Sequence, residues 1–295
     1  MARKNTGEQI ALNLVLILLS VIAVAPFLLL LSSSLTLEST LVQEGYRFFP
    51  KNFSLYSYQY LFQSGGKIFR AYGITILVTV VGTTLGVLMT TMFAYPLSRR
   101  ELPHRKFFSF FVFFTMLFSG GLVPAYMMWS QTFHIKNTLF ALIIPGLLMN
   151  GFYIIMMRSF FTANIPDALI EAARIDGCGE YRILFQIVMP LSLPMMVTLI
   201  LMMGLGYWND WMNSLYYVTD ESLFSIQAIL NTIITNIQFI TSGAGSLASN
   251  VDMSKLPSVG VRMAIAIVGI IPVLIIYPFF QKYFIRGIVV GGVKG

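Results

Sequence analysis

The sequence contains few charged residues. Asp, Glu, Lys and Arg make up 11% of its 295 residues, against about 25% in a typical soluble domain. Hydrophobic residues make up 57% of the chain, and the mean hydropathy is +0.78. A soluble domain with so few surface charges would not stay dissolved. The composition therefore argues against a soluble single-domain enzyme and indicates an integral membrane protein.

Cysteine and histidine are almost absent. Cys178 is the single cysteine, which excludes an internal disulfide and a cysteine-based zinc site. The only histidines, His104 and His134, lie far apart in the sequence. We therefore expect no metal site. A membrane-embedded hydrolase or transferase would need a Ser-His, paired-Asp or His-metal group within its apolar segments, which contain no His and a single Asp, so no catalytic residue is expected. Nucleic-acid binding is not expected either, because no basic run with interleaved aromatic residues occurs.

Long apolar runs dominate the sequence instead. A membrane-spanning helix needs about 20 apolar residues. Six windows meet this length: Ile10–Leu31, Tyr72–Leu97, Phe107–Trp129, Leu139–Met157, Leu191–Tyr217 and Val261–Phe280. The first is too long for a signal peptide, and Pro272 and Pro278 predict a kink or partial break in the sixth. The predicted fold class is an all-α integral membrane protein with six transmembrane helices.

The basic residues predict the orientation of these helices. Most of the 19 Lys and Arg residues fall on one set of connections, and the positive-inside rule then places both termini in the cytoplasm. The expected layout is a cytoplasmic N-terminus (1–9), a first span (10–31), an external loop (32–71), a core of spans two to six (72–280) with a cytoplasmic loop (164–190) and an external loop (218–258), and a cytoplasmic tail (281–295).

The sequence lacks two features that would indicate an energy source for transport: buried carboxylates and a phosphate-binding loop. The six windows hold only two full charges, Asp210 and Arg262, whereas proton-coupled carriers usually contain buried carboxylates. This argues against a stand-alone secondary carrier for a small polar solute, which stays the alternative hypothesis. The only Gly-Lys pair resembling a phosphate-binding loop, Gly66-Lys67, lacks the glycine and the Ser or Thr that the motif requires. ATP hydrolysis would therefore need a separate subunit.

A short cytoplasmic helix is predicted after Asn164. Pro166 suits its first turn, Asp167 complements the helix dipole, and Gly177 suits the position just after its end. A small apolar face, suited to docking in a shallow groove, is predicted from the spacing of Ala168, Leu169, Ala172 and Ala173. The alternative is that this face rests on the membrane or on the protein's own bundle.

The opposite side of this helix is predicted to be polar. Glu171 and Arg174 lie three residues apart and can pair with each other on that side.

This segment resembles the EAA loop of ABC-importer permeases. It has Glu171-Ala-Ala, then Gly177 and Gly179, and an Ile-x-x-Pro at Ile187–Pro190. The ending in Gly-x-Val-Lys-Gly is similar to that of the second permease subunit of maltose-type carbohydrate importers. Phe118–Tyr126 resembles the subgroup for complex oligosaccharides, the lipoprotein, alginate and pectin-fragment type.

The resemblance implies a type I ABC importer permease fold and a translocating rather than enzymatic role. It makes the cytoplasmic helix a coupling helix that seats in an ATPase subunit. The implied coupling residues are Asp167, Glu171, Ala172, Ala173, Asp176 and Gly177. The implied tail contacts with the ATPase are Gly292, Val293, Lys294 and Gly295.

No cofactor is expected in this chain, because ATP and Mg²⁺ would belong to the partner ATPases. The implied partners are a second permease subunit, two ATPase subunits, an extracytoplasmic sugar-binding protein and membrane lipid, and the implied location is the bacterial plasma membrane. The resemblance also implies that an external loop docks the binding protein through Ser242, Gly243, Ala244, Gly245 and Ser246. The alternative for that loop is a flexible surface loop.

Trp208, Asn209 and Asp210 are candidates to line a sugar pathway, because aromatic faces and polar edges suit pyranose rings. The alternative is an anchor at the outer membrane interface.

Overall fold

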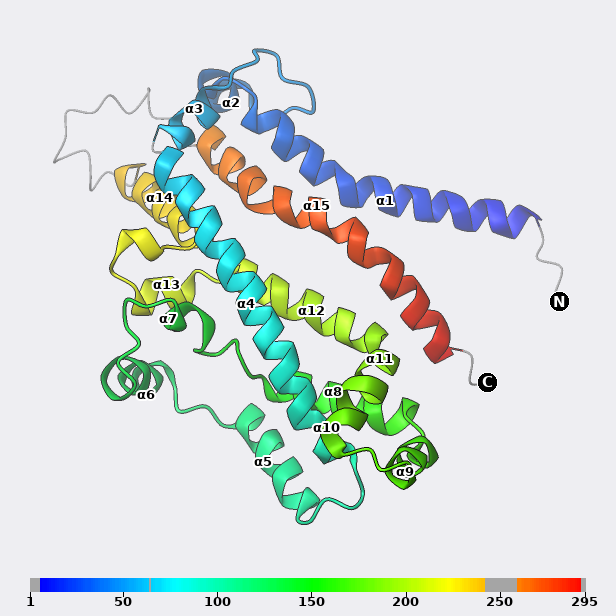
Figure 1. Ribbon diagram of the computed structural model, residues 1–295. Helices are drawn as coiled ribbons and strands as arrows, with labels where there is room; N and C mark the ends of the chain where they lie inside the picture. Colours follow the sequence, from blue (N-terminus) through cyan, green and yellow to red (C-terminus); the bar gives the residue numbers. More distant parts are fainter. Residues whose placement is uncertain (1–5, 64, 242–258, 293–295) are drawn as a thin grey trace. The chain divides into compact units, whose positions relative to one another are not determined.

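The computed structural model describes residues 6–63, 65–241 and 259–292, and Figure 1 shows long helices joined by shorter ones. The β contact within this part of the chain is one isolated antiparallel bridge between Thr36 and Phe53. The all-α prediction is therefore confirmed. The chain divides into two compact units, 1–68 with 230–272 and 69–229 with 273–295, which are described one at a time.

The first unit contains the N-terminal helix and the loop that follows it. Its helices are α1 (Thr6–Ser34), α2 (Glu38–Glu44), α3 (Tyr56–Phe62), most of α14 (Ile226–Thr241) and the beginning of α15 (Val259–Gly292). The Glu38 carboxylate accepts hydrogen bonds from the backbone N–H groups of Val259 and Gly260, both at 2.8 Å. Glu38 thereby caps the start of α15, whose first N–H groups have no partner within the helix.

The second unit contains most of the remaining helices. They are α4 (Gly65–Ser98, from Phe69 on), α5 (Arg105–Leu117), α6 (Leu122–Met127), the π-helix η1 (Met128–Thr132), α7 (Phe140–Ile143), α8 (Gly151–Asn164), α9 (Asp167–Ile175), α10 (Glu180–Ile183), the π-helix η2 (Leu184–Val188), α11 (Met189–Leu191), α12 (Leu193–Trp208), α13 (Met212–Tyr217) and the 3₁₀-helix η3 (Glu221–Leu223).

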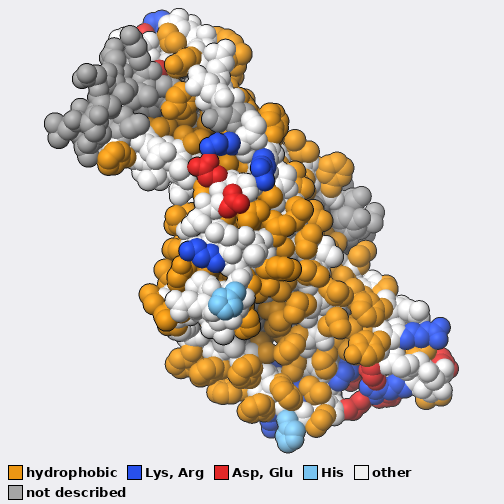
Figure 2. Space-filling model, turned by 60° about the vertical axis from the view of Figure 1, so that its left-hand side comes forward, with side chains coloured by type: hydrophobic (Ala, Val, Ile, Leu, Met, Phe, Trp, Pro, Cys, Tyr) orange, Lys and Arg blue, Asp and Glu red, His pale blue; other side chains and the backbone are white. Residues whose placement is uncertain are grey.

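Three helices among the described residues are long and apolar enough to cross a membrane: Gln9–Ser34, Gly66–Ser98 and Val259–Phe279. Two bent helix pairs raise the number to five if each pair is one span: Arg105–Leu117 with Leu122–Thr132 at 111°, and Glu180–Leu191 with Leu193–Trp208 at 83°. Figure 2 shows the broad hydrophobic surface that such helices present. This surface is the one expected of a protein that contacts lipid or other apolar helices.

Two of the predicted spans differ from the structure. The window Leu139–Met157 is not one helix, because α7 ends at Ile143 and α8 begins at Gly151. Gly146, which follows Pro145, has a φ of +72° between them, a conformation that a regular helix excludes. In the sixth window, the predicted feature at Pro272 and Pro278 is a kink or a partial break, and α15 continues through both prolines without a break.

Close packing joins α4 to α12 within the second unit. A Cβ atom on Gly82 would lie 2.4 Å from the ring of Tyr207, and one on Gly86 would lie 3.2 Å from Met203 Sδ. The Tyr207 hydroxyl donates to the carbonyl of Ile143 at 2.8 Å. A side chain at position 82 would therefore clash with the Tyr207 ring of α12, whereas one at position 86 would make a tight contact both with Met203 and with the carbonyl of Leu148.

Candidate functional site

The backbone at both ends of α9 explains why this helix is short. It begins at Asp167, directly after Pro166, whose ψ of 134° is extended. At the other end Gly177 has a φ of +78°. Its N–H donates to the Arg174 carbonyl and the Cys178 N–H donates to the Ala173 carbonyl, both at 2.9 Å. This pair of bonds is a Schellman ending, so the helix end predicted at Gly177 is confirmed.

One face of α9 packs on the chain's own core. Ile170 is only 2% exposed and Ala173 is also buried, in a cluster with Phe161 of α8 and Ile183 of α10. The sequence spacing had placed Ala173 on the docking face. The structure places it inside, because it lies three residues after Ile170 and shares that side of the helix.

The other face of α9 is exposed. Ile175 is 86% exposed, and the face also contains Ala168, Leu169, Glu171 and Ala172. We call these five residues the free face of α9. It is apolar except for Glu171, which was expected on the opposite side of the helix but lies one residue from Ala172 on the exposed side. The two alanines of this face allow a close approach by another surface.

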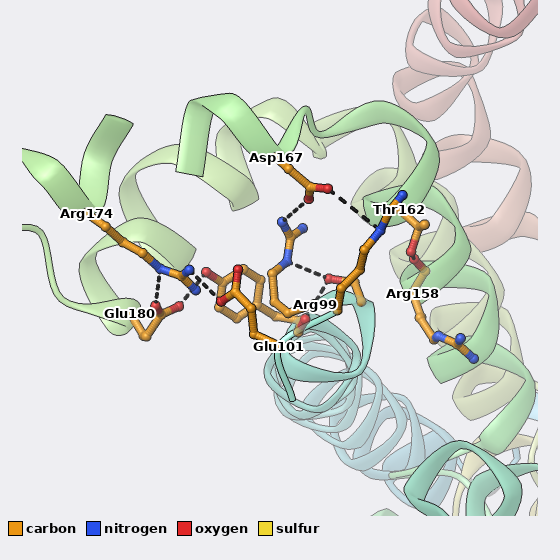
Figure 3. Close-up of polar contacts among 10 residues, drawn as sticks. Arg99, Glu101, Arg158, Thr162, Asp167, Arg174 and Glu180 are labelled. Atoms are coloured by element: carbon orange, nitrogen blue, oxygen red, sulfur yellow. Dashed lines mark hydrogen bonds and ion pairs between the residues drawn. The ribbon is translucent and has the colours of Figure 1, made fainter. Parts of the chain in front are cut away.

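The polar side chains around α9 are tied to the end of α4 (Figure 3). At the start of α9, the Asp167 carboxylate lies 3.3 Å from Nη1 of Arg99 and 4.0 Å from Nε of Arg100. The side chain of Arg99 is only 8% exposed, whereas that of Asp167 is 59% exposed. A charge this deeply buried needs a partner, and Asp167 supplies it.

At the other end of α9, Arg174 binds two carboxylates. Its guanidinium lies 2.5 Å from Glu101 Oε2 and 2.8 Å from Glu180 Oε1. These hydrogen bonds raise the pKa of Arg174 above its usual range and keep the residue charged. The predicted pairing of Glu171 with Arg174 is therefore wrong. Local spacing favoured Glu171, but two acidic side chains outside the helix reach Arg174 instead.

Tyr95 of α4 joins the two groups of charges. Its hydroxyl donates to Glu180 Oε2 at 2.7 Å, and its ring centroid lies 5.3 Å from the guanidinium carbon of Arg99. Sequence reasoning missed Tyr95, and it used Arg99 only as a charge that orients the membrane spans. The available signal was the Arg-Arg-Glu run at the end of a long apolar window, where charged residues meet the membrane boundary.

The pathway candidates lie at the end of α12. Trp208 is buried and lines a cavity of about 280 Å³ between α4, α12 and the second half of α15. The Asn209 side chain donates back to the Leu205 carbonyl at 2.9 Å. The Asp210 carboxylate accepts from the N–H of Met212 at 3.1 Å. The side chains of Asn209 and Asp210 thus bond to nearby backbone groups, whereas Trp208 lines a cavity.

Two groups of predicted residues are outside this description. Ser242–Ser246 of the docking loop and Val293–Gly295 of the tail lie outside the described residues. Gly292 is the last residue of α15.

Comparison with known proteins gives a consistent result. Residues 82–290 match the model of the family described as "Binding-protein-dependent transport system inner membrane component". The chain is 37% identical to the polygalacturonan/rhamnogalacturonan transport system permease protein YtcP of Bacillus subtilis over 95% of this chain and 96% of that protein. It is 35% identical to protein LplC of the same organism, over 93% and 90% of the two chains.

A solved structure is also similar. A chain of a bacterial ABC transporter involved in the import of the acidic polysaccharide alginate superimposes with a TM-score of 0.78 and 28% identity, covering 96% of this chain and 99% of that one.

Proposed function

The chain belongs to the family of binding-protein-dependent transport system inner membrane components, and from this premise we propose that it imports an oligosaccharide as one permease subunit of an ATP-driven complex. An extracytoplasmic binding protein delivers the sugar, and a second permease subunit completes the pathway. The names of the similar permease and the similar transporter, which refer to polygalacturonan and to alginate, support a carbohydrate substrate. The location is the plasma membrane of a bacterium.

The free face of α9 is the observation that carries this proposal. A helix that buries Ile170 in its own core and leaves Ile175 exposed has an apolar surface suited to a second protein. Burial of an isoleucine side chain contributes about 1.5–3 kcal/mol, so even this small surface can support docking. We propose that it seats in the ATPase subunit.

Each coupling residue then has a distinct role. Glu171 supplies a polar or ionic contact to the ATPase, and Ala172 allows the close approach. Gly177 sets the turn that ends the helix, and the exposed Asp176 lies next to it at the edge of the contact. Asp167 and Ala173 act from within this chain, because Asp167 binds Arg99 and Ala173 is buried.

The chemistry of the cycle belongs to the partners. ATP and Mg²⁺ would be held by the two ATPase subunits, and closure of those subunits would move α9. The motion reaches the rest of the second unit through α8 and α10, which flank α9 in the chain and pack with it in one core. Rigid movement of packed helices is a known route to alternating access.

Three further contacts belong to the same proposal. Residues 292–295 contact the ATPase, Ser242–Ser246 contact the binding protein, and Trp208 lines the sugar path. The buried position of Trp208 beside a cavity supports the last of these.

Site-specific crosslinking tests the docking of α9. Ala172→Cys is introduced into a Cys178→Ser background in the complete transporter, and a short bifunctional thiol crosslinker is added to native membranes. Ala163→Cys, at another exposed alanine on α8, is the matched control. We expect Ala172→Cys to crosslink to the ATPase and Ala163→Cys to do so much less. Crosslinks from position 172 only to lipid or to this chain would refute the proposal, and a stand-alone carrier would then be the better hypothesis.

A further inference from the structure

We propose that Tyr95, Arg99 and Arg174 are positioning residues that fix α9 to the end of α4, so that the coupling helix transmits force as a rigid lever. The inference rests on the proposed function and deepens it. It concerns how movement of α9 reaches the membrane spans, and none of these three residues is proposed to contact the ATPase.

The geometry forms one connected chain of contacts around α9 (Figure 3). We call it the polar clamp, and its members in order are Asp167, Arg99, Tyr95, Glu180, Arg174 and Glu101. It begins at the first residue of α9, passes through the last turn of α4 and the first residue of α10, and returns to the last turn of α9. Both ends of α9 are therefore bonded to the same segment, residues 99–101 directly after α4.

The apolar contacts of α9 cannot hold its direction alone. The buried apolar side chains within α9 itself are those of Ile170 and Ala173, which flank the middle of a nine-residue helix. Apolar burial is non-directional, so a load on Ile175 would tilt α9 about this patch. Charge-assisted hydrogen bonds are directional, and those at Asp167 and Arg174 act at the ends, where they oppose tilting most effectively.

The residues of the polar clamp differ in burial, and this difference predicts which substitution should disturb coupling most. Arg99 is almost fully buried, so water and salt screen its guanidinium little, although its partner Asp167 is more than half exposed. Glu101 and Glu180 are more than half exposed, and exposed ion pairs contribute little by themselves. Arg99 should therefore matter most, and Tyr95, which joins Arg99 to Glu180, should come next.

The test measures ATP hydrolysed per sugar imported by the complete complex in liposomes. Arg99→Met keeps the length of the side chain and removes its charge. Tyr95→Phe keeps the ring against Arg99 and removes only the bond to Glu180. Arg182→Met is the matched control, since Arg182 lies on α10 and its Nε donates to Gln186 at 2.9 Å, outside the clamp. Copurification of the ATPase is measured for every variant.

We expect the ratio of ATP to sugar to rise about tenfold in Arg99→Met, because a lost hydrogen bond to a charged group changes an equilibrium by about that factor. Tyr95→Phe should raise it about threefold and Arg182→Met not at all, with the ATPase bound in each. If Arg99→Met does not assemble, Tyr95→Phe decides alone. An unchanged ratio with the ATPase bound, or an equal rise in Arg182→Met, overturns the clamp. Failure of the wild-type chain to bind an ATPase overturns the proposed function instead.

Discussion

Two isoleucines of α9 show how strongly burial differs between the two sides of this short helix. Ile170 is 2% exposed and Ile175 is 86% exposed. They lie five residues apart, which places them on opposite sides of an α-helix. Ile170 packs in the core of its own chain, whereas most of the Ile175 side chain is exposed.

This difference shows that an amphipathic pattern alone does not reveal which surface covers each apolar side of a helix. Both isoleucines satisfy the same apolar periodicity, yet one is buried when the chain folds and the other can be buried only when another surface arrives. Mutations on the two sides should therefore separate folding from association.

The largest effect is expected from Ile170→Ala. Removing a fully buried isoleucine side chain costs about 2–5 kcal/mol, because the surrounding side chains of the core close the cavity only in part. Thermal unfolding of the detergent-solubilised permease pair should show a clear fall in midpoint. Ile175→Ala in the same assay is the control, and an equal fall in both variants would remove the distinction between the faces.

The site could be predicted from sequence only where the signal is local. Pro166, Asp167 and Gly177 are helix-end signals, and they gave the bounds of α9 within a residue or two. The partner of Arg174 could not be predicted, because Glu101 is 73 positions away in the chain and only the fold brings it near. The burial of Ala173 likewise depends on α8 and α10, which spacing within α9 does not reveal.

The fold shows the same limit. Apolar composition identified the three longest spans, but it does not measure whether a helix is continuous. The bends lie at Phe118–Gly121 and at Ser192, and the fourth window is interrupted around Gly146. Gly120-Gly121 and Pro145-Gly146 were visible as helix-breaking pairs and could have corrected the third and fourth windows.

An intermediate effect is expected from Ile175→Ala, and it should appear in the affinity for the ATPase subunit rather than in stability. Its unfolding midpoint should stay near that of the wild type, because surface substitutions usually change stability by less than about 0.5 kcal/mol. Its affinity for the ATPase subunit, measured by titration onto the immobilised permease pair, should fall about tenfold, as expected when most of a docked isoleucine side chain is lost. Unchanged affinity would mean that the free face is not the docking surface.

The smallest effect on stability is expected from Gly177→Ala. This substitution tests the left-handed turn between α9 and α10. Gly177 has a φ of +78°, and a Cβ there would meet no atom within 4 Å. The cost is therefore backbone strain alone, about 1 kcal/mol.

Gly179→Ala provides the matched control for this turn. Gly179 also has open space around it, but its φ is −72°, which alanine adopts freely. We expect Gly177→Ala to lower the unfolding midpoint slightly and Gly179→Ala to leave it unchanged or raise it. Equal midpoints would show that the left-handed conformation of Gly177 does not constrain α9. The length of α9 would then be set by Pro166 and the polar clamp rather than by Gly177.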